Sequence, residues 1–280
     1  MKTAKAFAPA NISCIFRIHE HKNPRWMGSS GVGFTVNEGV VVSVKATNNE
    51  KNIIKFSNKK IIFPTVESII KKLNKNNENF EINIESKLPL GCGFGLSGAS
   101  ALATAYALNK LLNLKKNQKE LAIIAHTAEA ENKTGLGDVV NQFYGGFCVK
   151  SKPSSHFIVK RLNINGINVY CKYFGRISTK SIITNPKLKN KINKSASIAL
   201  NKIKNLNNKN IKFKDIIKIS KGFAVGSGLL KDKNTIEAIK NIEKNKGNAS
   251  MIMLGNAVFS DKYFKGAIKL KISDKKACLL

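Results

Sequence analysis

The sequence PLGCGFGLSGASA at residues 89–101 runs a glycine-dense loop directly into a helix of small residues, which we expect from Ser97 to about Asn113. Four glycines within eight residues let the backbone turn its N–H groups toward a ligand, because glycine has no Cβ to obstruct the approach. The first turn of the helix adds unpaired N–H groups and the positive end of the helix dipole. The pattern therefore predicts an anion site, best suited to a nucleotide phosphate, made by Gly91, Gly93, Phe94, Gly95, Leu96, Ser97 and Gly98.

Two better-known phosphate motifs do not fit this stretch. The glycines spell the dinucleotide fingerprint, but that motif needs a strand feeding directly into the loop and a second strand that ends in an acid about 20 residues on. Here a polar segment, Ser86–Pro89, separates the preceding strand-like run from the glycines. The P-loop is absent as well, since no Gly-Lys-Ser or Gly-Lys-Thr closes the loop. One alternative stays open: the glycines only let a helix pack closely on a sheet.

The chain is strongly basic, with 48 Lys and Arg against 17 Asp and Glu and a formal net charge of +31. Such a balance is typical of proteins that bind nucleic acid or anionic membranes. Nearly all the basic residues are lysines scattered among Asn and Ile, however, which indicates a coding bias toward AT-rich codons. We therefore expect no specific nucleic-acid partner, only a field that attracts acidic metabolites and weakens with salt.

The five cysteines are odd in number, widely spaced and never arranged as Cys-x-x-Cys, so they support neither a disulfide framework nor a zinc knuckle. No apolar run reaches the roughly 18 residues of a membrane span, and the first residues lack the apolar region of a signal peptide. We expect a cytoplasmic protein with no membrane partner.

Hydrophobic periodicity predicts strands and helices in alternation. In the first half we expect strands at 3–7, 12–18, 51–56, 60–63 and 80–85, a hairpin of 32–36 with 40–44, and helices at 64–74, 97–113 and 118–131. In the second half we expect strands at 156–161, 167–174, 250–254 and 267–272, helices at 186–204, 213–230 and 234–245, and a solvated loop at 205–214. The length favours about two domains, and the composition change at 151–155 divides the chain into residues 1–152 and 153–280.

Two carboxylates stand out at the end of the helix predicted at 118–131. Glu129 follows His126 by one helical turn, so the two side chains can face the same cavity. Asp138 follows in an irregular loop, Gly135-Leu136-Gly137-Asp138. This arrangement suits a division of labour in which Glu129 holds a divalent cation and Asp138 acts on a substrate hydroxyl. The alternative is that both carboxylates only balance nearby lysines.

The glycine loop also resembles a family motif. Pro-x-x-x-Gly-Leu-Gly-Ser-Ser-Ala-Ala is the phosphate loop of the GHMP kinases, which are named for galactose, homoserine, mevalonate and phosphomevalonate. Residues 89–99 are similar to it, with Leu96 and Gly98 in place of its first Ser and first Ala. Residues 134–138, followed by Tyr144-Gly145-Gly146, resemble the family's catalytic Ser-Gly-x-Asp loop and aromatic-Gly-Gly, with one extra residue in the loop.

The resemblance implies an α+β fold of the two-domain GHMP-kinase type, with an N-terminal lobe like domain 2 of ribosomal protein S5 and a C-terminal ferredoxin-like lobe. It implies ATP as phosphate donor, Mg²⁺ bound by Ser97 and Glu129, and Asp138 as the catalytic residue. Residues 8–11, Ala-Pro-Ala-Asn, resemble the family's opening Ala-Pro-Gly-Lys. Asn11 departs from it, since many relatives have a lysine there near the reacting hydroxyl, and we expect Mg²⁺ and the helix dipole to carry more of the electrostatic work.

Four stretches are similar to one branch of the family, the archaeal pantoate kinases: residues 28–33, 88–95, 125–129 with 135–140, and 249–259. This resemblance implies ATP-dependent phosphorylation of the primary hydroxyl of (R)-pantoate to 4-phosphopantoate, a step of coenzyme A biosynthesis. It also implies that Ser29, His126 and Lys150 bind pantoate. The branch has an arginine where this chain has Lys150, and a lysine supplies the charge but not the bidentate fork of a guanidinium.

Two other classes of function stay open on the sequence. One is a related small-molecule kinase acting on homoserine, mevalonate or another hydroxy acid. The other is a non-catalytic, basic nucleic-acid binder. The oligomeric state is not fixed by the sequence, and a homodimer remains one option.

Overall fold

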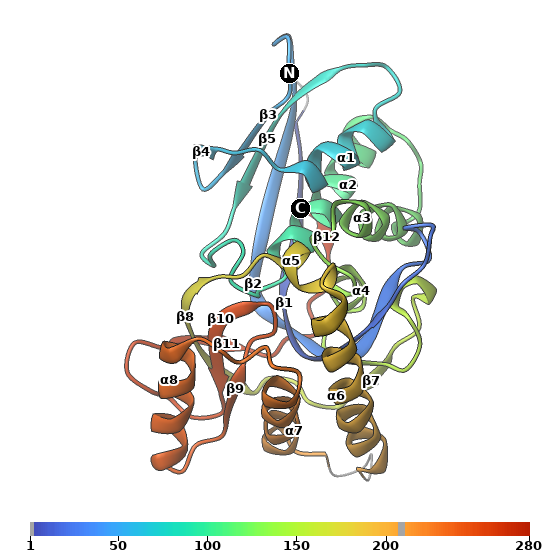
Figure 1. Ribbon diagram of the computed structural model, residues 1–280. Helices are drawn as coiled ribbons and strands as arrows, with labels where there is room; N and C mark the ends of the chain where they lie inside the picture. The colour runs from blue at the N-terminus through green and yellow to red at the C-terminus, as the bar shows by residue number, and fades with distance from the viewer. Residues whose placement is uncertain (1–2, 207–210) are drawn as a thin grey trace.

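The computed structural model describes residues 3–206 and 211–280, which form two β-sheets with helices packed around them (Figure 1). Within those residues the larger sheet has eight strands in the order β12-β1-β2-β5-β3-β4, with β6 paired to β2 and β7 paired to β6. Its strands are β1 (Thr3–His19), β2 (Gly28–Thr47), β3 (Ile53–Phe56), β4 (Lys59–Lys60), β5 (Asn79–Glu85), β6 (Phe147–Lys150), β7 (Lys160–Leu162) and β12 (Cys278–Leu279).

The smaller sheet is antiparallel and has the order β11-β8-β10-β9. Its strands are β8 (Asn168–Arg176), β9 (Ala249–Met251), β10 (Gly255–Ser260) and β11 (Ile268–Lys271). Two sheets, one mixed and one antiparallel, covered by helices confirm the α+β fold class predicted from the sequence.

The helices divide between the two sheets, as Figure 1 shows. They are α1 (Pro64–Leu73), α2 (Leu96–Leu111), α3 (Gln118–Asn132), α4 (Asp138–Tyr144), α5 (Thr179–Ile183), α6 (Pro186–Asn205), α7 (Phe213–Gly226) and α8 (Lys233–Lys244). α1, α2 and α3 pack on one another beside the long strands β1 and β2, whereas α7 and α8 pack on the strands of the smaller sheet. α6 contacts both β1 and α7, and so lies between the two groups.

Helix α2 is the most deeply buried helix of the site region. Its alanines Ala99, Ala101, Ala103, Ala105 and Ala107 have no exposed surface, and neither do Ala6, Ala8 and Ala10 of β1. α2 packs against both β1 and β2. Small side chains on both surfaces permit a close approach, and α2 is buried along most of its length. This packing holds the N-terminus of α2 in one position.

The predictions for the first strands are wrong. The sequence predicts a break at 8–10 and a hairpin turn at 37–39, but β1 and β2 are single long strands paired from Thr3 with Lys45 to His19 with Gly28. The turn-like residues fall where the register shifts between Pro9 and Asn11, so they form an irregularity within the pair. Gly39 lies there against Ala8, whose carbonyl oxygen would overlap a Cβ at position 39.

Several short elements are also missing from the predictions. Asp138, expected in a loop, is the first residue of α4, and an acidic residue there is favoured by the helix dipole. α5, β6, β10 and β12 are likewise unpredicted, since elements of two to seven residues are too short to show a periodic pattern. The strand predicted at 60–63 shortens to β4, and the one at 156–161 gives way to a 3₁₀ turn (Ser154–His156) followed by β7.

The solvated loop predicted at 205–214 falls partly on residues 207–210, which lie outside the described residues. On either side of them, α6 ends at Asn205 and α7 begins at Phe213. All five cysteines are free, and four of them are buried. Across residues 3–206 and 211–280, no helix combines the length and the apolar character that crossing a membrane requires.

An aromatic cluster joins the two sheets. Phe34 of β2 stacks on Phe147 of β6 with ring centroids 5.1 Å apart. Phe34 also forms T-shaped pairs with Phe213 of α7 and Phe259 of β10, with ring centroids 5.6 and 5.9 Å apart. All four rings are buried in one apolar core to which both sheets contribute. The division of the chain at residues 152 and 153 stays a prediction.

Candidate active site

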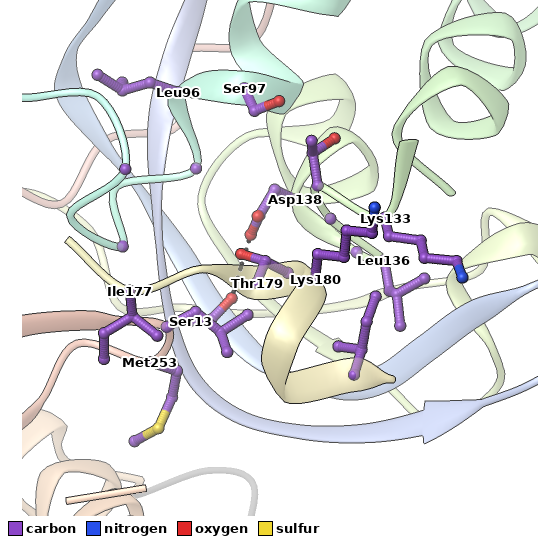
Figure 2. Close-up of a pocket in the computed structure, with 18 of the residues that line it drawn as sticks. Ser13, Leu96, Ser97, Lys133, Leu136, Asp138, Ile177, Thr179, Lys180 and Met253 are labelled. Carbon is purple, nitrogen blue, oxygen red and sulfur yellow. Dashed lines mark hydrogen bonds between the residues drawn. The ribbon is translucent and has the colours of Figure 1, made fainter. Parts of the chain in front are cut away.

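A cavity of about 390 Å³ lies where the glycine loop, the residues before α4, the start of α5 and the β9–β10 turn meet. Figure 2 shows Ser97 of α2, Asp138 of α4 and Lys180 of α5 around this space. The predicted site residues that line it are Ser29, Gly91, Gly93, Phe94, Gly95, Leu96, Ser97 and Asp138. The other four, Gly98, His126, Glu129 and Lys150, are not among the residues that line it.

The glycine loop ends in an open helix terminus. Gly91, Gly93 and Gly95 have φ values of 82°, 88° and 63°, a region in which a side chain is strained. α2 begins directly after Gly95, and no side chain caps its first turn. The N–H groups at the start of α2 are therefore available to an anion in the cavity, and the helix dipole favours a negative charge there.

The Asp138 carboxylate is held from β1. Asn11 Nδ2 donates a hydrogen bond of 2.6 Å to Asp138 Oδ1, and Ser13 Oγ donates one of 3.2 Å to the same oxygen. Burial raises the pKa of Asp138, while the Lys150 ammonium and the two donors oppose that rise. Since both hydrogen bonds end on Oδ1, Oδ2 remains for a group in the cavity. The carboxylate is thus oriented on one side and available to a substrate on the other.

The Glu129 carboxylate is enclosed between two glycines. A Cβ at Gly98 would lie 2.8 Å from Glu129 Oε2, and a Cβ at Gly135 would overlap the same oxygen. Thr134 Oγ1 donates a hydrogen bond of 3.0 Å to Oε1, whereas Oε2 is buried without a partner among the described residues. Burial, and then the charge of Asp138, raise the pKa of Glu129 to about 8. A buried, unpaired carboxylate oxygen next to the cavity is a group that a cation would stabilise.

These residues fit a magnesium ion better than a transition metal. In the described part of the chain, no three His, Cys, Asp or Glu side chains come together as a metal site. Mg²⁺ is usually held by one or two carboxylates, water and substrate phosphates rather than by a protein cage. Glu129 Oε2 supplies such a carboxylate, and the Ser97 hydroxyl lies at the cavity on the first turn of α2. The donor set therefore suits Mg²⁺, which would take its remaining ligands from water or a phosphate.

The three predicted pantoate ligands lie at different depths. Ser29 lines the cavity. Lys150 is buried behind it, where its Nζ donates hydrogen bonds to Gly137 O (3.2 Å) and Asn141 Oδ1 (2.8 Å), and burial lowers its pKa. His126 is 1% exposed and lies 2.8 Å from the carbonyl oxygen of Met27. Their contact with a substrate stays a prediction.

The His126 ring is neutral near pH 7. Burial lowers its pKa to about 4, against the opposing effect of the Met27 carbonyl. A carbonyl oxygen only accepts, so Nε2 carries the proton and donates to it. Nδ1 is then an acceptor, and it has no partner among the described residues. His126 can therefore accept a hydrogen bond but does not supply a positive charge.

Sequence reasoning missed several residues at this site. Ser13 lies two residues after Asn11 on β1 and therefore on the same face, so strand alternation could have found it. Lys133 and Lys180 line the cavity and are exposed, and they bring positive charge to its mouth. Lys180 could not be found, because it lies on α5, which was not predicted. Asn141 contacts both Asn11 and Lys150 but carries no motif of its own.

Comparison with protein families gives a match over residues 60–146 to the model described as the N-terminal domain of GHMP kinases. Among curated proteins, a pantoate kinase of Methanocaldococcus jannaschii is 36% identical over 256 residues, which cover 90% of each chain.

Two solved structures share the fold over nearly the whole chain. One is a phosphotransferase related to the CoA biosynthesis pathway, with a TM-score of 0.85 and 24% identity, covering 99% of this chain and 98% of the other. The second is MDDEF in complex with MVAPP, AMPPCP and magnesium, with a TM-score of 0.73 and 12% identity at the same coverage. At these identities the two structures support the fold.

Proposed function

Because the chain belongs to the GHMP kinases and, among them, to the pantoate kinases, we propose that it transfers the γ-phosphoryl group of ATP to the primary hydroxyl of (R)-pantoate. The products are 4-phosphopantoate and ADP, and the reaction is a step of coenzyme A biosynthesis. The observation that carries this proposal is the 36% identity to a pantoate kinase over 90% of both chains. The cavity supports it with two features that phosphoryl transfer needs, an uncapped helix terminus and a carboxylate facing the same space.

The chain's own groups divide the work of phosphoryl transfer, a reaction in which positioning and charge neutralisation matter most. The N–H groups of the glycine loop and the first turn of α2 bind the phosphates of ATP. Glu129 and Ser97 hold Mg²⁺, which when bound neutralises charge on the transferred phosphoryl group. The Asp138 carboxylate orients the primary hydroxyl of pantoate and accepts its proton as the new O–P bond forms and the bond from the γ-phosphorus to ADP breaks.

Pantoate is an anion, and the cavity suits one. The exposed lysines Lys133 and Lys180 at its mouth attract the carboxylate, and the net charge of +31 adds a long-range field of the same sign. Ser29 offers a hydroxyl at the wall. Lys150 bonds the backbone of Gly137 in that wall, and His126 bonds Met27, two residues before Ser29. We propose that both contact pantoate after a small adjustment or support Ser29 in doing so.

A substrate panel tests the proposed function. We expect ADP release, followed with a coupled assay, to give a kcat/KM for (R)-pantoate at least about 100-fold above the values for homoserine and mevalonate, because a site that pairs with one set of polar groups rejects ligands lacking them. A higher value for homoserine or mevalonate would identify a different GHMP kinase. ADP release with none of them, together with nucleic-acid binding that weakens steeply with salt, would indicate a nucleic-acid binder instead.

A further inference from the structure

A chain of side-chain hydrogen bonds connects Lys150 to Asp138. Lys150 Nζ donates to Asn141 Oδ1 at 2.8 Å, and Asn141 Nδ2 donates to Asn11 Oδ1 at 2.8 Å. Asn11 Nδ2 then donates to Asp138 Oδ1 at 2.6 Å. These hydrogen bonds join β6, α4 and β1, and the side chains of Asn141 and Asn11 are fully buried.

The direction of these hydrogen bonds is fixed at both ends. An ammonium group can only donate, and an ionised carboxylate can only accept. Asn141 must therefore turn its Oδ1 to Lys150, which leaves its Nδ2 to face Asn11. Asn11 in turn must present Oδ1 to Asn141 and Nδ2 to Asp138. Turning either amide over would bring two acceptors or two donors together in a buried site, where an unmade hydrogen bond is costly.

We propose that Asn141 is a positioning residue of the kinase, and that Lys150 acts on Asp138 through the amides of Asn141 and Asn11. The ammonium fixes the orientation of both amides, so that Asn11 always offers a donor to Asp138 Oδ1. Oδ2 is thereby kept toward the substrate hydroxyl. Position 11 of the protein is an asparagine, so the charge of Lys150 acts on the Asp138 carboxylate through two amides instead of a direct contact.

Two variants of Asn141 separate this role from packing. Asn141→Asp keeps the size of the side chain and the acceptor for Lys150, but it turns the donor that faces Asn11 into an acceptor. Asn11 is then drawn between two carboxylates and loses its fixed orientation. Asn141→Leu removes both hydrogen bonds but adds no competing acceptor, so Asn11 loses one of the two contacts that orient it and keeps the one to Asp138.

We expect Asn141→Asp to lower kcat by about 10–100-fold, a part of what a general base contributes, with the KM for MgATP unchanged because the glycine loop is untouched. Asn141→Leu should lower kcat less while lowering the melting temperature more. If Asn141 only fills space and pairs with Lys150, the order reverses, and the aspartate variant is the milder one. That reversed order, or an unchanged kcat in both variants, would overturn the proposal.

Asn109→Asp is the matched control, since it makes the same substitution near the C-terminal end of α2, whereas Asn141 lies on α4. Asn109 bonds the backbone of Lys116, away from the residues that line the cavity. We expect this variant to keep the wild-type kcat. A loss as large as that of Asn141→Asp would mean that added charge alone explains the effect, and the proposal would fail.

A second measurement needs neither a variant nor activity. In isotope-labelled wild-type protein, we expect scalar couplings across the hydrogen bonds from Asn11 Nδ2 to Asp138 Cγ and from Asn141 Nδ2 to Asn11 Cγ. A coupling from Asn11 Nδ2 to Asn141 Cγ, or the absence of both expected couplings, would overturn the proposal even if the variants fail to fold. The kinetic test rests on the proposed function, whereas the couplings do not. If the wild-type protein were inactive on pantoate, the proposed function would be rejected, and the couplings alone would decide whether Lys150, Asn141 and Asn11 orient Asp138.

Discussion

Asp138→Asn should lower kcat by about 10²–10⁴-fold, the range that a general base contributes. The substitution keeps the shape of the side chain and an oxygen that can accept from Asn11 and Ser13, so the fold should be retained. What it removes is the negative charge that orients the pantoate hydroxyl and accepts its proton. Steady-state kinetics with saturating MgATP and (R)-pantoate measure the change, and circular dichroism and the melting temperature check the fold.

Asp274→Asn serves as the control for this variant. Asp274 pairs with Arg161 at the surface, where both side chains are about half exposed. An exposed ion pair of this kind contributes little, so the variant should retain the wild-type kcat. Wild-type turnover in Asp138→Asn would reject the catalytic assignment of that carboxylate.

Glu129→Gln should raise the Mg²⁺ concentration needed for half-maximal activity by at least about 10-fold, since even the loss of an outer-shell partner weakens a metal site by that factor. The change is nearly isosteric, and the substituted side chain keeps an oxygen that can accept the hydrogen bond from Thr134 Oγ1. The variant thus loses the charge while its packing is kept. A Mg²⁺ titration of activity, supported by calorimetric titration of Mg²⁺ with an ATP analogue, gives the measurement.

The control lies two positions further along the same helix. Glu131 is exposed at the end of α3 and pairs with Lys72, so Glu131→Gln removes the same charge without touching the cavity. Its Mg²⁺ titration should superimpose on that of the wild type. If Glu129→Gln also gives an unchanged titration, Glu129 does not hold the ion.

The sequence could predict those parts of the site that are local in the chain. The glycine loop and the start of α2 form one continuous motif, and the structure places them at the cavity as expected from it. Glu129 could be placed on its helix because α3 shows both an apolar stripe and a clear N-terminus, a capping box at Asn117. In each case the residues that form the sequence pattern are the same few residues that form the structural element.

The contacts that orient Asp138 could not be predicted, because they join distant parts of the chain. Asn11 and Ser13 are 127 and 125 positions away from Asp138. They reach it only because β1 runs unbroken past the site, whereas Pro9 suggested that the strand ends there. β2 holds a similar irregularity at Gly39, where close contact with Ala8 takes the place of a turn. The turn signals at Pro9 and Gly39 correctly indicate an irregular backbone, but they wrongly predict that the chain reverses direction. The two strands stay paired on either side of the irregularity, which only shifts their register.

The central claim is that the glycine loop, Glu129 and Asp138 surround one MgATP and one pantoate molecule. A crystal structure of the protein with a non-hydrolysable ATP analogue, Mg²⁺ and (R)-pantoate tests it most directly. We predict the terminal phosphate on the N–H groups at the start of α2, Mg²⁺ at Glu129 and Ser97, and the primary hydroxyl of pantoate within hydrogen-bond distance of Asp138. Phosphates bound away from α2, or a pantoate hydroxyl that does not reach Asp138, would contradict the account.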